Sequence, residues 1–141
     1  AAARRKYPAL IKAFWRPVPM LEAGAVIGRN GLATAMLDNS DGLARSAAII
    51  ASLSKCRVVL SPGEELCPAP LRAYSAAAGR PWRRYVLNGG EDYGLIFTAR
   101  PSALPAIKRL LPAASVAGRI EKGSGAVIEN YDGKVESFEH F

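Results

Sequence analysis

Residues 33–43 read Ala-Thr-Ala-Met-Leu-Asp-Asn-Ser-Asp-Gly-Leu, and this stretch does most to indicate the fold. An apolar run is followed at once by Asp38, Ser40 and Asp41, and then by Gly42 and a segment with helical spacing. The pattern predicts a buried strand that delivers two carboxylates and a hydroxyl to the N-terminus of a helix. Carboxylates suit a hard cation, and free backbone N–H groups at a helix start suit anionic oxygens.

Two interpretations of this turn assign its side chains different roles. In a helix cap, Ser40 or Asp41 would accept hydrogen bonds from N–H groups of the first turn. Capping does not explain Asp38, because this residue ends a strand that is otherwise apolar. In a ligand site, the carboxylates would hold Mg²⁺, which binds through one or two carboxylates and shares phosphate oxygens. The local sequence leaves both interpretations open.

Periodicity and turn residues elsewhere predict helices and strands in alternation. Helices are expected at 4–14, 20–29, from 41 onward, 71–78 and 102–111, where Ser102 would be the cap. Strands are expected at 33–37, 56–60, 93–98, 116–121, 126–130 and 134–138, and 80–88 is ambiguous. The last three strands predict a closing meander with tight turns. The order favours one domain of the α+β class, a mixed sheet backed by helices, over a doubly wound fold.

Composition narrows the class of protein. The chain has 141 residues, of which 50% are hydrophobic and 22% charged, as expected of a globular domain. It has no apolar run long enough for a membrane helix and no signal-peptide pattern at its start. Cys56 and Cys67 lack the spacing of a zinc site or a disulfide framework, so a cytoplasmic location is expected. The net charge of +7 is compatible with nucleic acid, but the basic residues are scattered and no nucleic-acid motif accompanies them.

A second candidate motif, Asn-Gly-Gly-Glu-Asp-Tyr, occupies residues 88–93. It predicts a tight turn in which the two glycines supply positive φ, and a strand follows. The adjacent acids Glu91 and Asp92 would point to opposite sides of an extended chain, so one would face a site and the other solvent.

Several classes of chemistry are excluded within this chain. His140 is the single histidine, so neither a histidine metal cluster nor a Ser-His-Asp triad can form. Ser40 therefore has no histidine to activate it as a nucleophile. The sequence also lacks a P-loop and a Gly-x-Gly-x-x-Gly fingerprint. A nucleotide would have to be bound by another kind of site.

The order of motifs resembles that of thiamine-monophosphate kinases, in the aminoimidazole ribonucleotide synthetase-like superfamily. The resemblance rests on Arg-Pro-Val-Pro at 16–19, Glu-Ala-Gly at 22–24, the stretches 38–43 and 89–98, Gly-Arg-Ile at 118–120 and His-Phe at 140–141. It implies Mg²⁺-dependent, direct in-line transfer of the γ-phosphoryl of ATP to thiamine monophosphate. It also implies that residues 1–141 match only a C-terminal domain. An N-terminal domain with the dimer interface would lie outside this chain, which alone is expected to be inactive.

The resemblance also implies roles for single residues. These are Mg²⁺ ligation by Asp38 and Asp41, ATP contact by Ser40, and contacts to thiamine monophosphate by Glu91 and Phe141. Three positions depart from the family pattern, namely Met20, Ser46 and Gly94. These departures keep two alternatives open. One is a related enzyme that acts with ATP on another small molecule, and the other is a non-enzymatic module that binds a ligand or nucleic acid.

Overall fold

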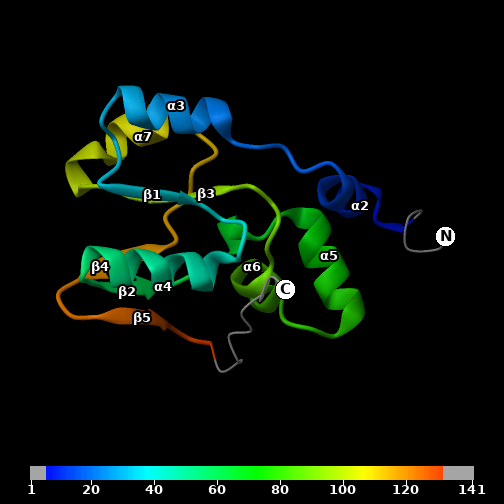
Figure 1. Ribbon diagram of the computed structural model, residues 1–141. Helices are drawn as coiled ribbons and strands as arrows, with labels where there is room; N and C mark the ends of the chain where they lie inside the picture. Colours follow the sequence, from blue (N-terminus) through cyan, green and yellow to red (C-terminus); the bar gives the residue numbers. More distant parts are fainter. Residues whose placement is uncertain (1–5, 132–141) are drawn as a thin grey trace.

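Helices and strands alternate along residues 6–131, the part of the chain that the computed structural model describes (Figure 1). The α-helices are α2 (Pro8–Trp15), α3 (Leu21–Arg29), α4 (Leu43–Ser54), α5 (Ala69–Ala78), α6 (Trp82–Asn88) and α7 (Leu104–Leu110). The strands are β1 (Ala35–Asp38), β2 (Arg57–Leu60), β3 (Leu95–Thr98), β4 (Gly118–Glu121) and β5 (Gly125–Ile128). Two 3₁₀ turns, η1 (Glu64–Leu66) and η2 (Pro101–Ala103), complete the order. The strand predicted at 134–138 lies outside the described residues.

A two-stranded antiparallel sheet joins β1 to β3, with Asp38 opposite Leu95. Helices α3 and α7 cover one face of this sheet (Figure 1), where Ile27 and Ile107 pack with Leu95 and Phe97. Because side chains alternate along a strand, Leu37 and Ile96 belong to the opposite face, which packs against α4. Both faces are therefore covered, although the sheet has only two strands.

The second sheet has three strands in the order β4-β2-β5, with β4 antiparallel and β5 parallel to β2. Helix α4 packs against strands of both sheets and supplies most of the main core through residues such as Ala47 and Ile50. The mixed sheet backed by helices is confirmed. The strands are nevertheless divided between two sheets rather than joined in one.

The predicted closing meander is wrong over the described residues. Strand β2 lies between β4 and β5, so the segment 122–124 crosses the start of β2 instead of making a hairpin turn. A side chain at Gly123 would approach the Arg57 side chain, which shows how closely the connection passes. Turn residues indicated the reversal correctly, but they carry no information about which strand lies between.

Most of the helices and strands predicted from the sequence begin and end within a few residues of their predicted bounds. The ambiguous segment 80–88 contains α6, which follows Pro81 and ends at Gly89. Ser102 is not the cap of α7, because it lies inside η2 and the cap position is Ala103. No helix in the described range of residues is long and apolar enough to cross a membrane.

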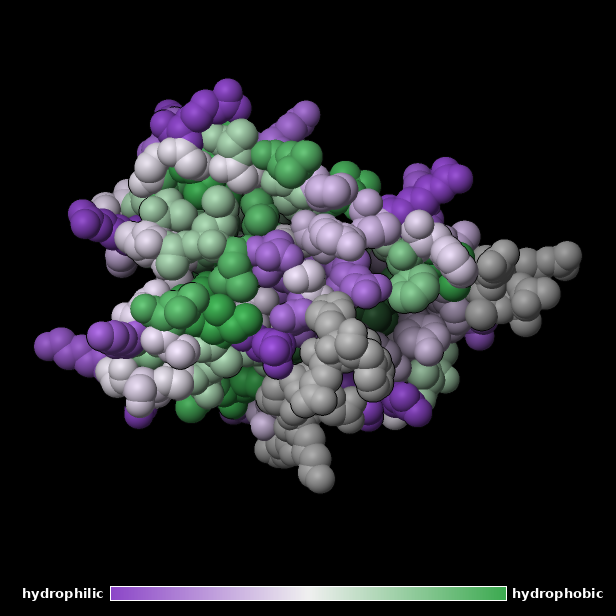
Figure 2. Space-filling model, in the orientation of Figure 1, coloured by the Kyte–Doolittle hydropathy of each residue, from purple (hydrophilic) through white to green (hydrophobic). Residues whose placement is uncertain are grey.

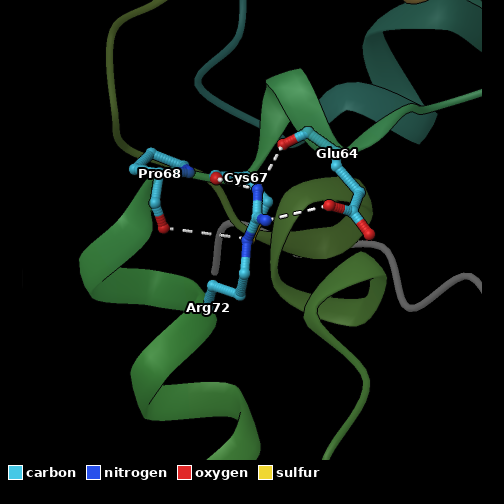
Figure 3. Close-up of polar contacts among 4 residues, drawn as sticks. All are labelled: Glu64, Cys67, Pro68 and Arg72. Atoms are coloured by element: carbon cyan, nitrogen blue, oxygen red, sulfur yellow. Dashed lines mark hydrogen bonds and ion pairs between the residues drawn. The ribbon is translucent and has the colours of Figure 1, made fainter.

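The segment before α5 is held by one arginine (Figure 3). Arg72 donates to the Glu64 carboxylate at 2.8 Å, to the Glu64 carbonyl at 3.1 Å and to the Cys67 carbonyl at 3.4 Å. These contacts attach η1 to the first turns of α5. They lie outside the two motifs and serve the fold.

Candidate functional site

The two sequence motifs meet at one end of the β1–β3 pair. Because these strands are antiparallel, the turn 38–42 that follows β1 lies beside the turn 89–94 that precedes β3. The Glu91 N–H donates to the Ser40 carbonyl at 2.7 Å, and the Asn39 N–H donates to the Gly94 carbonyl at 2.9 Å. Figure 2 shows hydrophilic residues gathered near the middle of this face, over the loop between β1 and α4. The two motifs therefore form one structural unit, although they are about fifty residues apart in sequence.

Glycines allow these turns to approach each other closely. A Cβ on Gly90 would overlap the Ser40 carbonyl oxygen in the other turn, whereas one on Gly89 would overlap the Tyr85 carbonyl oxygen in α6, the helix that precedes it. Positive φ occurs at Glu91 (58°) and Tyr93 (51°), while Gly89 has a φ of −70°. The prediction that both glycines supply positive φ is therefore wrong. Gly89 and Gly90 are required because a side chain at either position would overlap neighbouring backbone, and not because of their conformational freedom.

The helix-cap interpretation of the first motif is also wrong. Gly42, with a φ of 91°, is the cap residue of α4, so neither Ser40 nor Asp41 occupies that position. The Asp41 carboxylate accepts a hydrogen bond from Arg45 Nε at 3.1 Å, one helical turn further on. A side chain at Gly42 would lie 3.0 Å from the carbonyl oxygens of Leu87 and Gly89, so this turn is also packed against the second motif.

Asp38 is an exposed carboxylate at the end of β1. A hydrogen bond from the Ser40 side chain lowers the pKa of Asp38 below its usual value, and backbone hydrogen bonds act in the same direction. Behind it, Ser46 is 1% exposed, and its hydroxyl donates to the Asp38 carbonyl at 3.3 Å. Asp38 is therefore ionised at neutral pH, and its backbone is held by the Ser46 hydroxyl and by pairing with Leu95.

The second motif presents its two acids differently from the prediction. The chain is not extended at Glu91, since its φ is positive, so the alternation argument does not apply there. Asp92 accepts from the Asn39 amide at 3.3 Å, while Glu91 is exposed beside Ser40. Phe141, the other residue expected at the substrate, lies outside the described residues.

The first motif offers a hard cation two carboxylates, Asp38 and Asp41, and Asp41 is also paired with Arg45. Within residues 6–131, no group of three or more His, Cys, Asp or Glu side chains could hold a metal ion. Asp38 and Asp41 supply at most two carboxylates, which is what Mg²⁺ uses when phosphate oxygens and waters complete its shell.

The structure also shows two residues with side-chain contacts in these turns, Arg45 and Asn39, that the sequence did not single out. The spacing of Asp41 and Arg45, four residues apart, could have predicted their ion pair.

Comparisons with known proteins give one family name repeatedly. No family model matches the chain. A thiamine-monophosphate kinase of Halobacterium salinarum is 34% identical over 112 residues, which are 78% of this chain and 36% of that protein. A thiamine-monophosphate kinase of Aquifex aeolicus is 29% identical over 135 residues, which are 94% of this chain and 42% of that protein. The chain thus spans about two-fifths of the length of the curated relatives it matches.

Comparison with solved structures gives the same family. AaThiL complexed with AMPPCP and TMP superposes with a TM-score of 0.77 at 28% identity, over 96% of this chain and 42% of that one. Thiamine-monophosphate kinase from Stenotrophomonas maltophilia K279a gives a TM-score of 0.76 at 28% identity, over 94% of this chain and 41% of that one. In sequence and in fold, the chain is therefore related to the thiamine-monophosphate kinases and corresponds to their C-terminal part.

Proposed function

We propose that this chain is the C-terminal half of an enzyme that transfers the γ-phosphoryl group of ATP to thiamine monophosphate, giving thiamine diphosphate. The observation that carries the proposal is the assembly of turns 38–42 and 89–94 into one unit with two carboxylates beside it. The names of the relatives support the reaction, and a related structure holds AMPPCP and TMP.

In this proposal Asp38 and Asp41 would hold Mg²⁺, which neutralises developing charge on the transferred phosphoryl group. Ser40 donates to Asp38 and contacts ATP from the same turn. Glu91, hydrogen-bonded through its backbone to Ser40, contacts the thiamine monophosphate, and Phe141 packs against the thiamine. Positioning and charge neutralisation dominate in-line phosphoryl transfer, so the chain needs no activated nucleophile.

The relatives are more than twice as long as their matched segments, so we assign the remaining part of the site to an N-terminal domain. That domain would also form a homodimer interface, and the enzyme would act in the cytoplasm. The isolated chain of 141 residues is then inactive, because the two turns supply only one wall of the site.

The test is thiamine diphosphate formation by the full-length protein with ATP, thiamine monophosphate and Mg²⁺. We expect Asp38→Asn and Asp41→Asn each to lower kcat at least about a hundredfold, as the loss of a group that stabilises transition-state charge does. Glu65→Gln, which neutralises an exposed carboxylate in η1, is the matched control and should leave kcat unchanged.

One observation favours a second candidate, a related enzyme that uses ATP on another small molecule. Ser46 stands where the family pattern has an acid, and it is buried with its hydroxyl on the Asp38 carbonyl. This chain thus has one carboxylate fewer near the turn. A panel of phosphorylated acceptors separates the candidates, because efficient thiamine diphosphate formation would eliminate the second one.

A further inference from the structure

Asn39 and Asp92 connect the two turns through their side chains. Asn39 Nδ2 lies 3.3 and 3.4 Å from the two carboxylate oxygens of Asp92, the latter distance being to Oδ1. The Asp92 Oδ1 also accepts the Gly94 N–H at 2.9 Å, so one carboxylate holds both its own turn and the neighbouring one. We refer to the Asn39–Asp92 contact as the latch.

The latch connects the first turn to residues 91–94, where the backbone has an unfavourable conformation. Glu91 and Tyr93 both have positive φ, which costs energy for residues with a side chain and persists only when the surroundings determine it. The bond from the Glu91 N–H to the Ser40 carbonyl holds one end of this turn. The latch and the bond from Asn39 N–H to Gly94 hold the other.

Only one orientation of the Asn39 side-chain amide allows a hydrogen bond to Asp92, and this orientation leaves a buried oxygen without a hydrogen-bond partner among the described residues. If it were flipped, Asn39 Oδ1 would face the Asp92 carboxylate and repel it. In the observed orientation, Oδ1 is buried and has no hydrogen-bond partner among the described residues. A buried acceptor without a partner offsets much of what the bond to Asp92 contributes. The latch thus adds little to the global free energy of unfolding, and its effect is on the local opening of the turn.

Gly94 has no side chain that would crowd the Asn39–Asp92 contact. A Cβ at this position would lie 3.2 Å from Asp92 Oδ1, which is tighter than ordinary van der Waals contact, and 3.8 Å from Asn39 Cβ. A larger residue would therefore press on the carboxylate that accepts from Asn39. The glycine and the latch are compatible features of the same turn.

We propose that the latch holds the turn that carries Glu91, and that Asn39 is thereby a positioning residue for the phosphoryl acceptor. The part that concerns the acceptor rests on the proposed function, while the part that concerns the turn does not. Asn39 acts through Asp92 and Glu91 and need not touch the substrate.

The test uses the full-length protein and measures amide hydrogen exchange together with kinetics. Asn39→Leu keeps the shape of the side chain and removes the donor. We expect exchange at the Glu91 and Gly94 amides to rise at least tenfold, and KM for thiamine monophosphate at least fivefold, with KM for ATP within twofold. Asn30→Leu, the same substitution at an exposed position after α3, is the matched control and should change none of these.

A swap separates the latch from a general effect on folding. Asn39→Asp places two carboxylates against each other and should increase exchange at Glu91. Adding Asp92→Asn restores one amide–carboxylate bond and an acceptor for the Gly94 N–H, so exchange and KM should return to within about twofold of wild type. This pair also tests the latch if Asn39→Leu does not fold.

Three results would overturn the inference. Unchanged exchange at Glu91 and Gly94 in both Asn39 variants would refute the latch. A swap that fails to restore protection would do the same. Faster exchange with an unchanged KM for the acceptor would refute the positioning role. If the wild-type protein forms no thiamine diphosphate, the proposed function fails while exchange still decides the latch.

Discussion

Gly90→Ala tests whether the two motif turns really depend on close backbone approach. The added Cβ would overlap the Ser40 carbonyl oxygen, which also accepts the Glu91 N–H at 2.7 Å. Because the obstacle is backbone, it cannot rotate away, and the turns must separate. Overpacking of this kind costs about 1–3 kcal/mol, and loss of the hydrogen bond adds about 1 kcal/mol. We therefore expect the free energy of unfolding to fall by about 2–4 kcal/mol.

Urea unfolding monitored by circular dichroism measures this change, since the midpoint shifts while the slope stays constant. Gly28→Ala is the matched control, because Gly28 lies in α3 and its added Cβ would have no atom within 4 Å. That variant should gain roughly 0.5–1 kcal/mol from helix propensity. The reasoning is refuted if Gly90→Ala unfolds within about 0.5 kcal/mol of the wild type, a shift typical of an ordinary surface substitution.

Two further predictions concern the same turns. Gly42→Ala should destabilise the protein more than Gly79→Ala, by about 1–3 kcal/mol in urea unfolding. Two features separate these glycines. Gly42 (φ 91°, ψ 152°) has a backbone conformation that is essentially restricted to glycine, whereas Gly79 (φ 61°, ψ 30°) is in the left-handed region that other residues also adopt. Only Gly42 has carbonyl oxygens 3.0 Å from the added Cβ. Ser40→Ala should raise the pKa of Asp38 toward its usual 3.8, measured by NMR titration of the carboxyl group. The Ser40 contact lowers the folded-state pKa, so its stabilisation is present above pH 3.8 and is lost as pH falls through the folded value. An Asp38 pKa unchanged in Ser40→Ala would contradict this assignment.

The elements were predictable to the extent that their signals are local. The helix of residues 43–54 and the strands on either side of it follow from apolar spacing and from breakers nearby in the chain. The position of β2 between β4 and β5 was not predictable in this way, because it depends on pairing between strands some sixty residues apart. A turn-rich segment such as 122–125 indicates that the chain reverses. It cannot indicate whether another strand already fills the space.

The glycines of the second motif show the same limit at the scale of one residue. Glycine serves a turn either by adopting positive φ or by leaving room for a neighbouring backbone. The sequence cannot distinguish these uses, because the second depends on a partner that is remote in the chain. For Gly90 that partner is the carbonyl of Ser40, and the positive φ falls on Glu91 instead.

The role of the first motif follows from which positions the fold itself requires. Gly42 provides the cap of α4, and buried Ser46 holds the Asp38 carbonyl, so the turn has its structural contacts without the Asp38 carboxylate. A carboxylate that is exposed, ionised and held by Ser40 at the end of an apolar strand contributes little to folding. In the proposed function its position is explained by a cation that it would hold, and not by the stability of the chain. This is why neutralising Asp38 should reduce turnover while leaving the free energy of unfolding nearly unchanged.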